Sequence, residues 1–121
     1  MIIRSLTPML WTNAFQDTID FYTGRLGFVC GDRNDDWGWA GLYHGAIDLM
    51  VARPNAHTPF ERPVFTGSFY FKVDDLDAWW EVVKDQVEIV YAPETFAWNM
   101  REFGIHDNNG YILQFGQDLL K

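Results

Sequence analysis

Seven side chains of this 121-residue sequence have types and spacings suited to holding a small molecule. Aromatic rings offer flat faces for stacking, carboxylates supply negative charge, and hydroxyl and amide groups supply hydrogen bonds. The expected ligand-binding residues are Trp11, Asp48, Ser68, Tyr70, Trp98, Glu102 and Gln114. Stacking and cation–π contacts contribute roughly 0.5–2 kcal/mol each. Several of them on one surface would hold a planar or cationic molecule.

The cysteine and histidine residues of this sequence do not have the spacing of a nucleophilic or metal-dependent catalytic site. Cys30 is the one cysteine and lies on an expected strand with no histidine or basic partner nearby in the sequence, so a packed thiol is expected. His44, His57 and His106 fall at turns or in a proline-rich stretch. No catalytic residue is therefore expected from the pattern.

The candidate residues share one face of the strands that carry them. Side chains alternate across a strand, so Asp48 lies opposite Leu49, and Tyr70 lies opposite Phe71. The same alternation puts Gln114 on the side that mixes polar groups with Trp, Tyr and Met. One face of each sheet is uniformly apolar and would pack on helices, while the mixed face suits a ligand cleft.

The elements that must position these residues occur in the order β-α-β-β-β twice. Strands are expected over 7–12, 28–33, 37–43 and 46–52, then over 66–73, 87–91, 98–105 and 111–116. One helix follows a capping Asn13, and the other follows Asp74-Asp75. The sequence predicts an α+β domain with module one over 1–52, a linker over 53–65 and module two over 66–121.

Charge and cysteine content restrict the partners. Nine Lys and Arg against seventeen Asp and Glu give a net charge of −8. An acidic chain repels phosphate backbones and anionic lipids, so neither nucleic acid nor membrane is an expected partner. No apolar run approaches the roughly 18 residues of a membrane span. A single cysteine fits the reducing cytoplasm.

Two segments carry a resemblance to a known family. They are Asp20-Phe21-Tyr22-Thr23-Gly24-Arg25-Leu26-Gly27-Phe28 and the run from Trp98-Asn99-Met100-Arg101-Glu102-Phe103 to Asp107-Asn108-Asn109-Gly110. Both resemble the vicinal oxygen chelate superfamily of glyoxalases, bleomycin resistance proteins and dioxygenases, with the bleomycin-resistance branch most similar. The resemblance implies two βαβββ modules forming a curved mixed sheet around a cleft, and a homodimer.

The resemblance also locates the metal-ligand positions of the superfamily. By strand position they fall on Thr7, Asp48, Ser68 and Gln114. Only Asp48 is a good ligand for a divalent cation, because catalytic sites need about three imidazole or carboxylate ligands. No metal and no other cofactor is expected, which argues against chemistry that needs a metal as Lewis acid.

Three functions are compatible with these residues. The first is a metal-independent binding protein of the bleomycin-resistance type, which sequesters a cationic or aromatic small molecule in an aromatic-lined cleft. The second is a metal-dependent vicinal oxygen chelate enzyme (lyase, isomerase or dioxygenase) with a non-standard ligand set that includes Asp48. The third is a small-molecule sensor or accessory protein.

Overall fold

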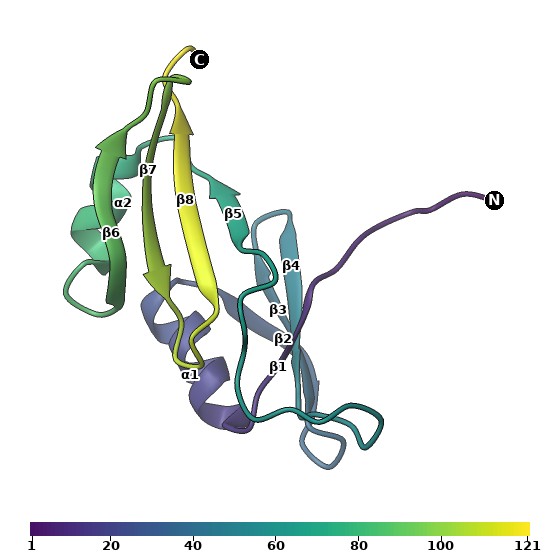
Figure 1. Ribbon diagram of the computed structural model, residues 1–121. Coiled ribbons are helices and arrows are strands. Elements are labelled where there is room, and N and C mark those ends of the chain that lie inside the picture. Colours follow the sequence, from purple (N-terminus) through teal and green to yellow (C-terminus); the bar gives the residue numbers. More distant parts are fainter. The chain divides into compact units, whose positions relative to one another are not determined.

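The chain consists of two compact units with the same element order. The computed structural model describes residues 1–121, divided into Met1–Arg62 (unit 1) and Pro63–Lys121 (unit 2). Each unit has one helix and one four-stranded mixed sheet (Figure 1). The predicted α+β class and paired βαβββ order are confirmed. The module boundaries at 52 and 66 stay a prediction.

Unit 1 builds its sheet in the order β1-β4-β3-β2. Its elements are β1 (Met9–Trp11), α1 (Phe15–Arg25), β2 (Val29–Asn34), β3 (Trp39–His44) and β4 (Ile47–Ala52). β1 runs parallel to β4, and the other neighbours are antiparallel. The turn between β3 and β4 contains Gly45 at φ 60°, a left-handed conformation that favours glycine.

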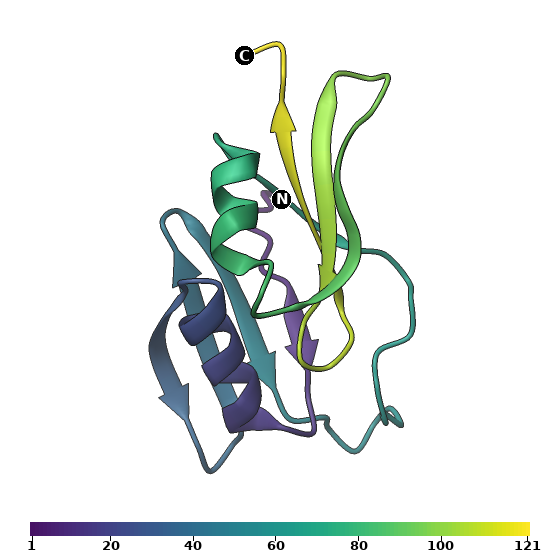
Figure 2. The same ribbon diagram turned by 90° about the vertical axis from the view of Figure 1, so that its left-hand side faces the viewer.

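The core of unit 1 lies between α1 and the sheet. Ile19 and Tyr22 of α1 are buried, as are Leu10, Leu49 and Val51 of the strands. Figure 2 shows α1 lying along one face of this sheet. The alternation expected for β1 and β4 is confirmed, because Leu10 is paired with Val51 on this face.

The start of α1 differs from the expected cap. Ala14 occupies the N-cap position and makes no side-chain capping bond. The Asn13 side chain donates instead to the carbonyl oxygen of Glu61 at 3.1 Å. The prediction of Asn13 as cap was wrong, because the helix begins one residue later, and the carbonyl oxygen of Ala14 accepts the first intrahelical bond from the Thr18 amide.

Unit 2 repeats the arrangement with the order β5-β8-β7-β6. Its elements are β5 (Phe69–Lys72), α2 (Leu76–Val83), β6 (Glu88–Thr95), β7 (Met100–His106) and β8 (Ile112–Asp118). β5 is parallel to β8, and the remaining pairs are antiparallel. Asp75 caps α2 as expected by accepting a hydrogen bond from the Ala78 amide at 3.1 Å.

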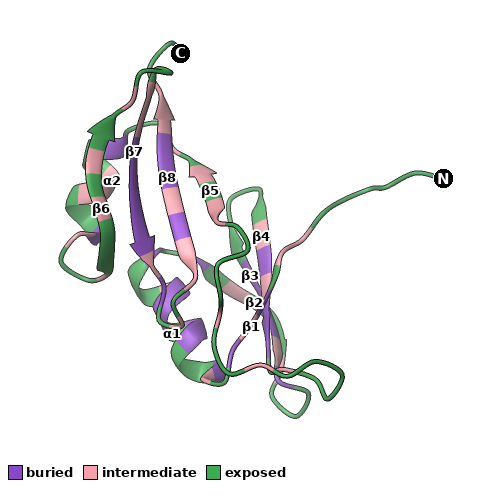
Figure 3. Ribbon diagram, in the orientation of Figure 1, coloured by how far each residue is buried: buried purple, intermediate pink, exposed green.

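Aromatic rings form the core of unit 2. Phe71 and Phe103 stack on Phe115 from either side, with ring centroids 5.2 and 5.1 Å away. Trp79 and Trp80 of α2 cover Phe115 and Phe103 respectively, at 5.8 and 5.1 Å. Figure 3 shows burial concentrated along β7 and alternating along β8. This packing fixes which face of the sheet points away from α2.

Neither helix of the structure has the length and apolar character needed to cross a membrane.

Candidate functional site

The face of the unit 2 sheet that points away from α2 carries a connected polar network. We call it the helix-free face of unit 2. Phe71, Phe103 and Phe115 occupy the helix side, so the residues that alternate with them point the other way. Four of the seven predicted ligand-binding residues lie there and are joined by hydrogen bonds: Ser68, Tyr70, Glu102 and Gln114.

Glu102 is the centre of this network. It lies on β7 with a relative exposure of 7%. Its two carboxylate oxygens accept separate bonds, from the Tyr70 hydroxyl at 2.6 Å and the Tyr91 hydroxyl at 3.3 Å. No ion pair in the structure involves Glu102. A buried carboxylate is thus held by neutral hydroxyls alone, and its charge has no cationic partner.

Two glycines let the tyrosine rings reach Glu102. Tyr70 starts on β5 and crosses Gly116 of β8 before its hydroxyl meets β7. A Cβ at Gly116 would overlap the Tyr70 ring and hydroxyl. Tyr91 starts on β6 and lies over Gly104 of β7, where a Cβ would come within 2.5 Å of its ring. Each ring therefore occupies space that any other residue type would fill.

The remaining bonds form a chain that ends on the same carboxylate. The Ser68 hydroxyl donates to the side-chain oxygen of Gln114. The Gln114 amide nitrogen donates to the Tyr91 hydroxyl at 2.9 Å, and Tyr91 in turn donates to Glu102. An ionised Glu102 only accepts, so its charge fixes the direction of every donor in the chain.

The network keeps both tyrosines protonated. Burial and the hydrogen bond to Glu102 raise the pKa of Tyr70 well above its ordinary value of 10.0. Burial also raises the pKa of Tyr91, and the nearby charge of Glu102 adds to it, while the bond from Gln114 acts in the opposite direction. At neutral pH these side chains are therefore hydrogen-bond donors.

A second carboxylate faces Glu102 across the strands. Glu94 of β6 is the direct register partner of Glu102 on β7. The next pair, Thr95 and Arg101, points toward α2, because Arg101 binds Asp77 of that helix at 3.1 Å. Glu94 and Glu102 consequently share the helix-free face. Like charges directly opposite each other on a sheet are unfavourable, so the pair concentrates uncompensated negative charge on this face.

Trp98 does not lie in a strand as expected. β7 begins at Met100, and Trp98 occupies the turn before it, followed by Asn99 at φ 64°. The Trp98 side chain is 63% exposed and stacks on Phe96, with centroids 4.7 Å apart and planes 11° from parallel. Phe96 meets Tyr91 edge to face at 6.4 Å. Trp98 is thus linked to Tyr91 of the network by ring contacts through Phe96, and not by a position on the helix-free face of β7.

The other two predicted residues belong to unit 1. Asp48 accepts a hydrogen bond from the Thr7 hydroxyl at 3.1 Å. Trp11 contacts the Phe60 ring edge to face at 5.9 Å. The β1–β4 register confirms that Met9 and Met50 alternate with the buried side chains, as Trp11 and Asp48 do.

Tyr91 of the network, and Glu94 and Phe96 beside it, are site residues that sequence reasoning missed. The expected strand, 87–91, ended at Tyr91, whereas β6 continues to Thr95. Proline is tolerated on edge strands and at bulges, and β6 is an edge strand whose pairing is irregular between Tyr91 and Glu94, where Pro93 lies. The run of alternating residues beyond Pro93 was the available signal.

The superfamily's metal positions hold a donor set that does not suit a divalent cation. Thr7 is bonded to Asp48, and Ser68 is bonded to Gln114. Three of these four groups are neutral, and the Gln114 oxygen already accepts a bond. No group of three or more His, Cys, Asp or Glu side chains suited to a metal occurs within either unit. The residues present therefore do not fit the metal of the superfamily.

Comparison with known proteins gives one matching family. The model of the Glyoxalase/Bleomycin resistance protein/Dioxygenase superfamily matches residues 4–115. No curated protein matches the chain.

Solved structures share the fold at low sequence identity. A superfamily member from Sphaerobacter thermophilus has a TM-score of 0.83 and 16% identity, with 96% of this chain and 98% of that chain covered. A protein of unknown function from Agrobacterium tumefaciens has a TM-score of 0.81 and 19% identity, covering 97% and 95%. A lactoylglutathione lyase from Agrobacterium tumefaciens reaches 0.72 and 18%, covering 97% and 95%. These likenesses concern the fold alone.

Proposed function

The chain belongs to the glyoxalase/bleomycin resistance protein/dioxygenase superfamily, and we propose that it is a metal-independent binding protein for a cationic, aromatic small molecule. The observation that carries this proposal is Glu102, a buried carboxylate with no cationic partner on the helix-free face of unit 2. A ligand that brings a positive charge to this face supplies the missing counter-charge.

Charge on neighbouring residues supports a cation. Glu94 faces Glu102 across β6 and β7 and is exposed, so a bound cation would relieve the repulsion between them. The chain as a whole carries −8, which favours the approach of a positive ligand. An anionic ligand would meet two carboxylates here.

Ring faces support an aromatic group on the same ligand. Trp98 offers one exposed face because its other face stacks on Phe96. Phe96 contacts the Tyr91 ring, and the Tyr91 hydroxyl binds Glu102. A continuous series of contacts therefore joins the stacked rings to the carboxylate. We propose that the ligand's cation binds Glu102 and Glu94, and that its ring stacks on Trp98.

Binding without a metal is supported by the chemistry of the donor groups. Hydroxyl and amide groups at Thr7, Ser68 and Gln114 are weak ligands and are bonded within the protein. Sequestration of a small molecule, the activity that we propose, requires binding but no chemical reaction. We therefore assign no catalytic residue.

We extend the proposal to the assembly and location of the protein. We propose a homodimer from the superfamily resemblance, and a cytoplasmic location because a chain with one cysteine does not depend on disulfides. We propose neither nucleic acid nor membrane as a partner, because of the negative charge.

Metal-free bleomycin, a cationic molecule with a planar aromatic part, tests the binding. Chelator-treated protein is titrated while tryptophan fluorescence is recorded. Saturable quenching at about one ligand per chain with micromolar affinity supports the proposal. Glu102→Gln is expected to weaken the affinity about tenfold or more, because it removes a buried charge that pairs with the ligand.

Glu81→Gln is the matched control. Glu81 lies on α2, is exposed and pairs with Lys84, so the same loss of charge leaves the network intact. Equal affinity in wild type and Glu102→Gln would remove Glu102 from the site. No binding of bleomycin or other aromatic cations to the metal-free protein, with binding or turnover restored by a stoichiometric divalent metal, would favour the metal-dependent enzyme instead.

A further inference from the structure

Unit 1 contains a solvent-open hollow that the proposed function does not use. Its volume is about 540 Å³, which falls in the usual range for small-molecule sites. Seven residues between Arg53 and Phe60, all but His57, form most of its wall, and Thr12 and Asn13 just before α1 complete it. Arg53 is the one charged side chain that lines it. The chain is strongly acidic, yet the one charge that lines this hollow is positive.

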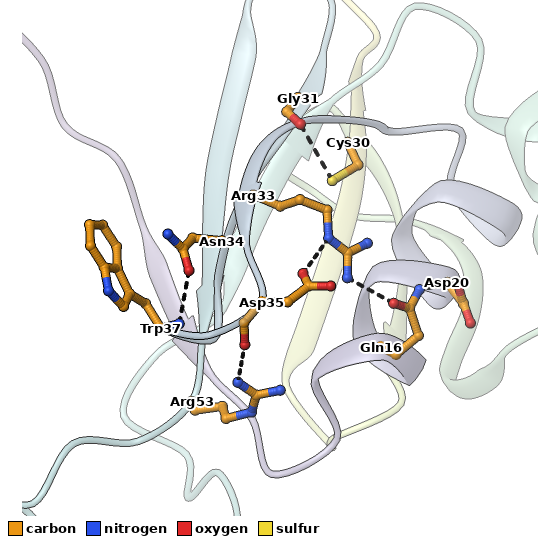
Figure 4. A network of polar contacts seen from close by, with 9 residues as sticks. All are labelled: Gln16, Asp20, Cys30, Gly31, Arg33, Asn34, Asp35, Trp37 and Arg53. Atoms are coloured by element: carbon orange, nitrogen blue, oxygen red, sulfur yellow. Dashed lines mark hydrogen bonds and ion pairs between the residues drawn. The ribbon is translucent and has the colours of Figure 1, made fainter.

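Arg53 is held in place by three contacts. Its Nη1 donates to the carbonyl oxygen of Asp35 at 2.8 Å (Figure 4). The guanidinium lies over the Phe15 ring, 4.9 Å from the centroid. Its aliphatic stem passes Gly38, where a Cβ would come within 2.6 Å of Cγ. The guanidinium is therefore oriented before any ligand arrives, and little side-chain entropy remains to be lost.

The charge of Arg53 is not neutralised within the protein. The nearby Asp35 carboxylate binds the neighbouring Arg33, with Nε to Oδ1 at 2.7 Å (Figure 4). That bond raises the pKa of Arg33, whereas Arg53 receives only the backbone carbonyl of Asp35. Arg53 takes part in no ion pair of the structure. Because a guanidinium has five N–H donors, most of those of Arg53 remain free.

Other polar groups of the hollow add donors beside Arg53. Asn55 uses its side-chain oxygen to accept from the His57 amide at 2.9 Å, which leaves its NH₂ group available. Thr58 is exposed and contributes a hydroxyl group. Both residues line the hollow. A guanidinium fork beside amide and hydroxyl donors matches the oxygen pairs of carboxylate and phosphate groups.

We propose that this hollow of unit 1 binds a small organic anion, with its carboxylate or phosphate group on Arg53 and an apolar part against Phe60. The site is independent of Glu102 and takes a ligand of opposite charge. A purely structural Arg53, which fastens the segment after β4 to α1 and the β2–β3 turn, predicts no anion binding.

The arginine side-chain N–H signals of ¹⁵N-labelled full-length protein test the proposal, with benzoate and phenyl phosphate as probes and benzamide as the neutral control. We expect at least one anion to shift the Arg53 Nε–H signal saturably at millimolar or lower concentration, and benzamide to leave it unchanged. The anion with the higher affinity identifies the head group. Absence of a saturable shift with either anion overturns the proposal.

Three variants separate binding from folding. Thr58→Val removes a hydroxyl but none of the contacts that hold Arg53, so we expect weaker anion binding by a few fold and an unchanged melting temperature. Arg53→Gln lacks the Arg53 Nε–H signal, so its affinity is followed by the backbone amide signal of Asn55, which lines the hollow, and we expect it to fall at least about tenfold. Arg4→Gln changes the net charge equally at an exposed position and should bind like wild type. Equal binding by Arg53→Gln, or equal loss in Arg4→Gln, contradicts the proposal.

Discussion

At the scale of single residues, the surroundings of Glu102 explain why a carboxylate is tolerated inside the sheet. Its two oxygens each accept a hydroxyl hydrogen bond, which offsets part of the cost of burying the charge. The same bonds act on the donors, since they stabilise the protonated form of each tyrosine. Charge and protonation in this network are thus linked.

Glu102→Gln should lower the pH at which Tyr70 ionises. The hydrogen bond and charge of Glu102 both raise the Tyr70 pKa, but burial is the larger cause, so the pKa should fall only part of the way toward 10.0. Ultraviolet absorbance of phenolate during an alkaline titration measures this, and Tyr70→Phe identifies the signal. An unchanged titration curve in Glu102→Gln would contradict the bond.

The raised pKa values also set the sign of a pH effect on stability. A tyrosine that stays protonated in the folded state contributes its full stabilisation below the unfolded pKa of about 10. That contribution is lost as the pH rises through the folded pKa. The free energy of unfolding should therefore fall above about pH 10, and Tyr70→Phe should fall less steeply.

Asp48→Asn tests whether unit 1 contributes to cation binding. The Thr7 hydroxyl donates to Asp48, and the oxygen of an asparagine can accept the same bond, so the fold should be retained. We expect affinity for a cationic probe to fall by about two- to fivefold at low salt and less at high salt. Affinity that is the same in both proteins would show that Asp48 does not contribute to cation binding.

At the scale of elements, the strand order of unit 2 creates the network. β5 and β7 are both neighbours of β8, so a side chain on β5 must cross β8 to reach β7. Gly116 supplies the room for Tyr70 to do so, and Gly104 on β7 does the same for Tyr91. Tyr43 on β3 of unit 1 lies similarly close to Gly31 of the adjoining β2. Tyrosine beside glycine on an adjoining strand is a recurring feature of both sheets.

Gly116→Ala should displace Tyr70 from Glu102. The added methyl group overlaps the tyrosine ring, so we expect a loss of about 1–3 kcal/mol in the free energy of unfolding. The alkaline titration of Tyr70 should shift toward the ordinary tyrosine value, because both burial and the Glu102 bond are weakened. Urea unfolding and phenolate absorbance measure the two effects.

Gly24→Ala is the control for this substitution. Gly24 lies in α1 with nothing within 4 Å of an added Cβ. Alanine in a helix is more favourable than glycine by about 0.5–1 kcal/mol, so this variant should be as stable as wild type or more so. If Gly116→Ala also keeps both its stability and the late ionisation of Tyr70, the ring does not depend on the glycine.

At the scale of the whole molecule, the chain has two units of equal design and an excess of negative charge. Each unit closes its own core between one helix and one sheet, and each carries a mixed face on the side away from that helix. The proposed homodimer belongs to this scale, because association depends on the surface of the folded chain and not on the residue pattern of any one strand.

The dimer is tested by mass and by concentration. Sedimentation should give a species of twice the 14.1 kDa chain mass. The melting temperature should rise with protein concentration, because association stabilises the folded state by mass action. A single species of the chain mass, with a melting temperature that does not depend on concentration, would contradict it.

Local chemistry in the sequence determined the element order, most strand phases and several turns. The alternation of Leu113, Gln114 and Phe115 is sufficient to assign the two faces of β8, because neighbouring side chains on a strand must point opposite ways. The capping role of Asp75 and the turn at Gly45 follow from equally local preferences. The α+β class could therefore be predicted from the sequence.

Only the tertiary structure decided which residues meet Glu102. Tyr70 and Tyr91 lie 32 and 11 positions away along the chain, and their hydroxyls reach the carboxylate because of strand order and register. Continuation of β6 past Pro93, which brings Glu94 opposite Glu102, depends on β6 being an edge strand with bulges. The alternation of residues in a strand predicts which side of the sheet each side chain faces. Which residues of other strands lie beside it depends on strand order and register, and these are set by the free energy of pairing between segments that are distant in the sequence.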